Sequence, residues 1–325
     1  MKSRRILNSM HLLSFALLAA ACGSADPGAI DGELLHYSYQ PGDSLAYDLD
    51  ASLSVVMSAS GNPMVAGAMD ADMVMTVTAR LGLDFAAGPS PDTVEITVTQ
   101  ELLDGGARME TMGQEMLIPL DDLAAQMEQE VVLVVDSQGR PVSATVGGMA
   151  LPAQLLAGTS SFGSGNLLTP QQFGPEFPDK PLAVGSEWTT DQTAEVLGLT
   201  FRQTGRHRIV AAEELAGRAV LRITSELTTA AIRTDLASLI AALQASPELL
   251  GGMDPGEMEA ALAQLQGTGA TVGIVMERST ASMTTWFDPA EGIVIRAVLE
   301  TPMNMTMTMR GLPGGEVSVL MRTST

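Results

Sequence analysis

The stretch from Ser282 to Arg310 constrains this chain most, because it reads as two or three long β-strands joined by a tight turn at Asp288 to Gly292. The last of these strands carries methionine at every second position, at Met303, Met305, Met307 and Met309. Side chains two residues apart lie on the same face of a strand. The four methionines are therefore expected on one face and the intervening polar residues on the other.

A second stretch, Met73 to Phe85, places an apolar side chain at every second of its thirteen residues without a break. At about 3.3 Å per residue it would span about 43 Å, well beyond the common strand of about five or six residues. Strands of this length imply a large sheet that curves. The chain is therefore predicted to be β-rich α+β, with long curved antiparallel sheets, half-barrel-like, and a few inserted helices.

The order of these patterns predicts two related β-rich halves, or one sheet of double length. The predicted regions are a signal peptide at 1–21, a lipidated tether at 22–33, an N-terminal half at 34–146, a connector at 147–180, and a C-terminal half at 181–325 with a helical insert at 234–266. Apolar residues at helical spacing also predict a helix from Leu117 to Gln129. The shared order suggests an internal duplication, while the unequal offsets between the halves leave coincidental all-β patterning open.

The N-terminus has the layout of a secretory signal. Lys2, Arg4 and Arg5 precede an apolar segment from Leu12 to Ala21 that is too short to span a membrane as a helix. The residues before Cys22 resemble a bacterial lipobox, in which the cysteine is acylated and becomes the first residue of the mature protein. That resemblance implies lipidation at Cys22 and a membrane anchor, with an outer-membrane location favoured because glycine rather than aspartate follows. A plain signal peptide with a chance cysteine is the alternative.

The charge of the mature chain excludes one class of partner. The predicted signal removes three of 17 basic residues, which leaves 14 against 38 acidic ones, a formal charge of 14 − 38 = −24. This excess repels nucleic acid. Because Cys22 is the only cysteine, neither an internal disulfide nor a multi-cysteine zinc site can form.

Together, the lipobox, the long alternating strands, the helices between early and late strands and the closing Asp-x-x-x-Gly hairpin resemble the half-barrel of LolA-like lipoprotein carriers. In that family a curved antiparallel sheet wraps around helices and holds acyl chains on its concave face. The segment Phe177 to Trp188 is also similar to a Pro-rich segment before Gly-Asp-x-Trp in uncharacterised bacterial lipoproteins. The resemblance implies ligand binding and brings no catalytic residue with it.

The candidate lining for a hydrophobic ligand comes from the two alternating stretches. It consists of Met73, Met75, Val77, Leu81, Met303, Met305, Met307 and Met309. Methionine is flexible and polarizable, which suits surfaces that accept varied apolar partners. Two alternatives stay open: a packed core face, and a copper(I) site of thioethers, although alternate residues of one strand lie about 7 Å apart and would need a second strand to share an ion.

Other polar groups offer little chemistry. His207 falls on the apolar parity of its strand, as a hydrogen-bonded core histidine would, and His36 is the other mature histidine. The acid pairs Asp48 with Asp50 and Asp70 with Asp72 lack the loop spacing of a calcium site, and are interpreted as solvated. Arg202, Arg206 and Arg208 predict a small basic patch on one strand face, which pairs with local acids, with a partner's carboxylates or with a head group.

The sequence therefore predicts a non-enzymatic, lipid-anchored envelope protein, without metal or other cofactor, that binds a hydrophobic small molecule or lipid such as acyl chains. The alternative is a structural or protein-interaction lipoprotein with a filled core and no ligand, whose protein partner the sequence does not identify.

Overall fold

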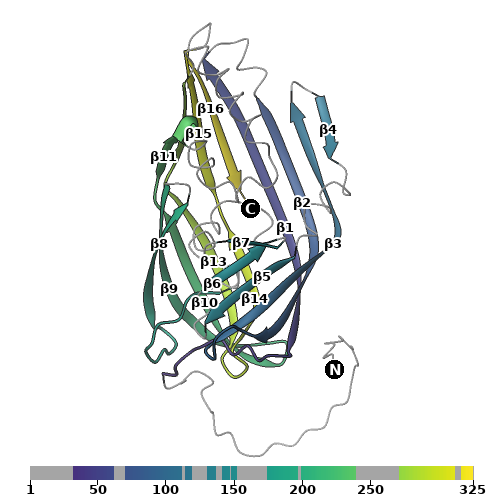
Figure 1. Ribbon diagram of the computed structural model, residues 1–325, viewed down its shortest axis with the longest axis vertical. Coiled ribbons are helices and arrows are strands. Elements are labelled where there is room, and N and C mark those ends of the chain that lie inside the picture. Colours follow the sequence, from purple (N-terminus) through teal and green to yellow (C-terminus); the bar gives the residue numbers. More distant parts are fainter. Residues whose placement is uncertain are drawn as a thin grey trace, which may run out of the picture.

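The computed structural model describes residues 32–61, 70–111, 114–118, 130–136, 141–146, 148–151, 174–196, 199–238, 271–311 and 316–324. Within these ranges the protein is almost entirely antiparallel β-structure in two sheets that do not close into a barrel (Figure 1). The predicted β-rich class with long curved sheets is thereby confirmed.

The larger sheet contains eleven strands. In spatial order these are β11 (Ile232–Asp235), β12 (Thr271–Met276), β15 (Met303–Arg310), β16 (Val317–Ser324), β1 (Ser44–Gly61), β2 (Ala71–Ala87), β3 (Thr93–Thr111), β5 (Val131–Asp136), β6 (Pro141–Val146) and β7 (Met149–Leu151), with β4 (Gln114–Ile118) paired to β3. The smaller sheet contains five strands. In order these are β14 (Ile293–Glu300), β13 (Ser279–Asp288), β10 (Arg218–Thr229), β9 (Leu199–Leu215) and β8 (Glu187–Val196).

The chain crosses from one sheet to the other at three neighbouring positions, so the two sheets form one bent surface. β10 leads into β11, β12 into β13, and β14 into β15, each time after two intervening residues and with the same neighbour order on both sides. Hydrogen bonds continue across the bend, from the Ala230 amide to the Arg202 carbonyl (2.9 Å) and from the Glu277 amide to the Asn304 carbonyl (3.0 Å). In Figure 1 the bend separates the lower strands β10, β13 and β14 from the upper strands β11 and β15.

The two alternating stretches form the strands that their patterns predict. Met73 to Phe85 lies within β2, which has 17 residues and pairs with β1 of 18 residues and β3 of 19 residues. Ser282 to Arg310 forms β13, β14 and β15, with the predicted turn between the first two. Asp288 caps that turn: its Oδ1 accepts the amides of Ala290 (3.0 Å) and Glu291 (3.1 Å). The buried Asp288 is held in place by Arg218, which donates to its Oδ2 at 2.9 Å.

The predicted helices are less well supported. The helix expected at Leu117 to Gln129 is wrong at its start, because Leu117 and Ile118 end β4 and pair with β3; backbone pairing with a neighbouring strand overrides weak helical spacing. In the predicted insert at 234–266, β11 continues to Asp235 and residues 236–238 are helical. Asp235 accepts the Ser238 amide at 2.7 Å, as an N-cap does. The rest of both segments lies outside the described residues, as do Cys22 and the signal at 1–21.

Strands from both predicted halves take part in the larger sheet, since β11, β12, β15 and β16 follow the predicted connector and pair alongside β1 to β7. The division into two related halves stays a prediction. In the part of the chain that the structure describes, no helix has both the length and the apolar character needed to cross a membrane.

A chain of aromatic rings joins the two sheets near the C-terminal ends of β2 and β13, the end of the strands that lies lowest in Figure 1. Phe85 of β2 stacks on Tyr39 (4.8 Å between ring centroids), and Tyr39 stacks on Tyr37 (5.6 Å). Tyr37 contacts Phe177 (5.2 Å) and meets Phe287 of β13 edge-on (5.6 Å). The face of each sheet that carries these buried side chains is called the inner face below. Its lower end is filled by side chains.

Candidate functional site

Strand register gathers methionines from six strands on the inner face of the larger sheet. In one row across the sheet, Met57 of β1 pairs with Met321 of β16, Met321 with Met305 of β15, and Met305 with Met276 of β12. Directly paired residues share a face and lie about 5 Å apart. The half-buried members of this set, called the Met face, are Met57, Met73, Met75, Met109, Met276, Met303, Met305, Met307, Met309 and Met321. Met116 of β4 pairs with Met109 but is 49% exposed, so it is not counted in the Met face.

All ten side chains of the Met face are half-buried. The predicted lining residues therefore come together: Met73 and Met75 share this face with the four methionines of β15, with β1 and β16 between them. Three strand spacings separate the two groups by about 14 Å. Val77 and Leu81, also predicted to line a ligand site, are buried at 8% and 0% exposure and belong to the packed part of the inner face.

The pairing of Met305 with Met321 supplies the second strand that a copper(I) site would need. The methionines nevertheless spread over six strands as a broad layer and do not converge on one point. Among the described residues there is also no group of three or more His, Cys, Asp or Glu side chains that could hold a metal ion. The Met face is therefore interpreted as an apolar surface.

A row of polar side chains crosses the inner face at the bend, between the aromatic rings and the Met face. Gln192 of β8 pairs with Gln203 of β9, Gln203 with Thr229 of β10, and Thr229 with Ser279 of β13. Thr301, which follows β14, lines the same pocket. These five half-buried residues are called the polar belt. They lie on the face where the strand pattern would otherwise predict apolar residues.

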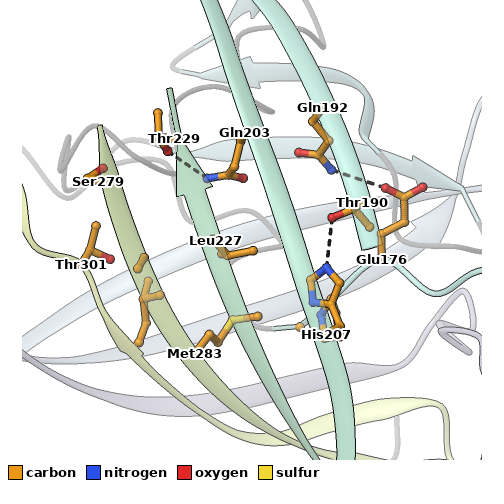
Figure 2. Close-up of a pocket in the computed structure, with 14 residues that line it drawn as sticks. Glu176, Thr190, Gln192, Gln203, His207, Leu227, Thr229, Ser279, Met283 and Thr301 are labelled. Atoms are coloured by element: carbon orange, nitrogen blue, oxygen red, sulfur yellow. Dashed lines mark hydrogen bonds between the residues drawn. The ribbon is translucent and has the colours of Figure 1, made fainter. Parts of the chain in front are cut away.

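The polar belt forms one wall of a pocket of about 50 Å³ (Figure 2). His207, whose ring stacks on Trp188, lines the pocket together with Thr190, and Glu176 lines it from the segment before β8. Gln192 donates to the Glu176 carboxylate at 3.4 Å, and Gln203 donates to the Thr229 hydroxyl at 3.5 Å. Among the described lining residues Glu176 is the only one that carries a charge at neutral pH.

His207 is held between two hydroxyl groups. Its Nε2 lies 3.0 Å from Thr190 Oγ1 and its Nδ1 lies 2.8 Å from Ser225 Oγ, while its ring stacks on Trp188 at 5.2 Å. Burial lowers the pKa of His207 to about 4, because the low-dielectric surroundings disfavour the charged imidazolium. The expectation of a buried, hydrogen-bonded core histidine is confirmed.

The absence of a side chain at Gly205 makes room for the hydrogen bond between His207 Nε2 and Thr190 Oγ1. A Cβ at Gly205 would collide with both His207 Nε2 and Thr190 Oγ1. The His207–Thr190 pair looks superficially like a nucleophile and its base. A base with a pKa of about 4 is, however, poorly matched to proton transfer at neutral pH. The His207–Thr190 hydrogen bond is therefore interpreted as a structural contact that keeps two polar groups paired in the pocket wall.

The other predicted polar groups lie on the opposite, solvent-facing side of the sheets. Arg202 donates to Asp191 in an exposed bidentate pair, which lowers the pKa of Asp191 through its hydrogen bonds and charge. Arg208 lies 3.7 Å from Glu187, so two of the three arginines of the predicted patch pair with local acids. In the predicted acid pairs, Asp48 pairs with Arg80 at 3.2 Å, Asp50 accepts the Thr78 hydroxyl and Asp70 accepts the Ala59 amide.

A second hollow, of about 500 Å³, lies on the solvent-facing side where β3 carries Gly105 and Gly106 beside β2. Its lining combines Asp104 and Arg108 with exposed apolar side chains such as Leu117. It is separate from both the Met face and the polar belt.

The sequence interpretation did not identify the polar belt or Glu176. The available signal was weak, because Gln203 and Thr229 occupy the same alternate positions of their strands as the buried residues His207 and Ile223. One polar residue in an apolar series is unremarkable, and only strand register shows that four such exceptions, Gln192, Gln203, Thr229 and Ser279, form a continuous row. No family model matches the chain, and no curated protein sequence matches it.

Proposed function

We propose that this protein is a non-enzymatic, lipid-anchored envelope protein that binds an apolar ligand such as an acyl chain on its Met face. The observation that carries the proposal is the half-buried layer of ten methionines on one face of the sheet. Thioether side chains adapt their shape to apolar partners at small energetic cost. The likeness of the chain's pattern to LolA-like half-barrels, whose concave face holds acyl chains, supports the same function.

The first test asks whether a ligand is present and whether it lies on the Met face. Organic extraction of the purified mature protein, followed by mass spectrometry, is expected to recover an apolar molecule in stoichiometric amount. A fluorescent fatty acid should then bind to the delipidated protein. The double substitution Met305→Gln with Met307→Gln should weaken its binding about thirtyfold, because burying a polar amide in place of a thioether costs about 1 kcal/mol per side chain, or about 2 kcal/mol for both.

The matched control is Thr306→Gln, on the same strand but on the opposite face. It is expected to leave the affinity unchanged. Equal weakening by the control and the double variant would contradict a ligand site on the Met face. Recovery of no ligand, together with no binding of the fatty acid, would contradict the proposed function as a whole.

The alternative function, a structural or protein-interaction lipoprotein, has one observation in its favour. The end of the inner face beyond the bend is filled by rings and by residues with 0% exposure such as Phe287 and Leu81, and the pocket that borders this end at the bend is small, about 50 Å³. Under this alternative the extraction recovers no ligand, and cross-linking in the envelope captures one defined protein partner.

The anchor is tested separately at Cys22. Replacement by alanine removes the thiol that an acyl chain would modify, so Cys22→Ala is expected to abolish incorporation of an alkyne-tagged fatty acid and to leave an unprocessed precursor. Ser24→Ala, two residues further on, is the control and should be labelled normally. Normal labelling of Cys22→Ala would refute the anchor, and with it the envelope location that rests on it.

A further inference from the structure

The polar belt and the Met face lie next to each other on the same continuous surface. Thr301 of the belt lies in the two-residue link between β14 and β15, and Met303 of the Met face begins β15 two residues later, at most about 7 Å further along the chain. On β9, Gln203 of the belt stands two residues from Phe201, which packs with Ile232 and Met276. An apolar chain lying on the Met face would therefore end directly at the pocket.

The chemistry of the pocket selects the kind of head group that fits there. Its described lining offers amide and hydroxyl groups and a single carboxylate, Glu176, with no lysine or arginine. An anionic phosphate or carboxylate head would meet a like charge without a compensating cation. A cation would gain the opposite charge of Glu176, since an ion pair favours the charged form of both partners. Burial keeps His207 neutral at pH 7, so it does not repel a cation.

The size of the pocket suits a small head group. A cavity of about 50 Å³ has room for a few water molecules, since one water needs about 10–15 Å³ by this measure. A primary ammonium group is small, and its three N–H donors match the carboxylate, amide and hydroxyl oxygens of the lining.

We propose that the pocket binds the primary ammonium head of an amphiphile whose hydrocarbon tail lies on the Met face. The inference rests on the proposed function, because it needs the tail to bind there. Glu176 supplies the negative charge that pairs with the ammonium group. The polar belt lies between this polar head and the hydrocarbon tail on the Met face.

The test compares three ligands with the same twelve-carbon chain: dodecylamine, dodecanol and dodecyl phosphate. Each is titrated at pH 7.4, below its micelle concentration, to displace an apolar fluorescent probe from the mature protein. Dodecylamine is expected to bind at least tenfold more tightly than dodecanol, and dodecyl phosphate more weakly than dodecanol. Glu176→Gln should reduce the preference for the amine to less than threefold while leaving the affinity for dodecanol unchanged.

Because the whole protein is strongly acidic, the control must remove one negative charge elsewhere. Glu187→Gln does so on β8, where Glu187 is exposed and faces Arg208. It should keep the full preference for the amine. A second variant, Gly205→Ala, places a methyl group against His207 and Thr190, and is expected to weaken amine binding more than dodecanol binding.

The outcomes separate the two proposals. If all three ligands bind equally well, or if Glu187→Gln and Glu176→Gln reduce the preference equally, the head-group site is overturned while ligand binding on the Met face stands. If none of the three displaces the probe, the proposed function fails and the head-group site falls with it.

Discussion

Replacing Phe287 with alanine is expected to lower the free energy of unfolding by about 3–5 kcal/mol, the usual cost of deleting a buried aromatic ring. The Phe287 side chain has 0% exposure. It lies 4.8 Å from the ring of Phe177 and 5.6 Å from that of Tyr37. Its loss would leave a cavity where the segment at 33–39 packs on the smaller sheet, so the rings that join the two sheets would lose contacts together.

The measurement is urea unfolding of the purified mature protein, followed by fluorescence of Trp188 and Trp286. Val298→Ala is the control, because Val298 lies on the neighbouring strand β14 with 40% exposure. Surface substitutions of this kind usually change stability by less than about 0.5 kcal/mol. A loss for Phe287→Ala no larger than that of the control would show that the ring chain does not hold the sheets together.

The second large effect is a dependence of stability on pH that comes from His207. Its pKa is about 4 in the folded protein against an ordinary 6.5, because burial disfavours the charged ring. The unfolded chain therefore binds the proton more tightly than the folded protein. The stability linked to His207 is fully present above pH 6.5, is lost as the pH falls towards 4, and loses no more below that. The difference between the pKa of His207 in the folded and the unfolded protein corresponds to about 3 kcal/mol of the free energy of unfolding.

Urea unfolding at pH 7 and at pH 4.5 measures this loss. His207→Gln keeps a polar side chain but cannot titrate, so it should lose about 2–3 kcal/mol less than the wild type over the same interval. Carboxylates contribute equally to both proteins and cancel in the comparison. His36→Gln removes an exposed histidine instead and is expected to behave as the wild type does. An equal loss for wild type and His207→Gln would show that His207 is not a buried neutral group.

The path of the backbone within each strand could be predicted from the sequence. Strict alternation in Met73 to Phe85 and in Met303 to Met309 admits only an extended chain, because a period of two does not fit a helix. The turn at Asp288 to Gly292 was also predictable, and its tight packing has a visible cause. Gly292 has φ of 65°, and a Cβ there would fall 2.5 Å from the Cβ of Ser38.

The neighbours of each strand could not be predicted. β16 and β1 pair over eight positions although they stand at opposite ends of the described chain. Backbone hydrogen bonds between strands carry little sequence information, and register depends on the whole apolar pattern and on the turns. Because strand neighbours could not be predicted, the sequence assigned Met73 and Leu81 of the same alternating stretch to one ligand lining. In the structure Leu81 is fully buried and Met73 is half-buried.

The sequence by itself determined that the chain forms long β-strands with methionines on one face of each, because side-chain alternation is a local property of the extended backbone. Only the tertiary structure decided that these faces join into one Met face and that a polar belt borders it. Pairing between distant strands creates both, since Gln192, Gln203, Thr229 and Ser279 become a row only when β8, β9, β10 and β13 lie in register. The candidate site is a product of that register.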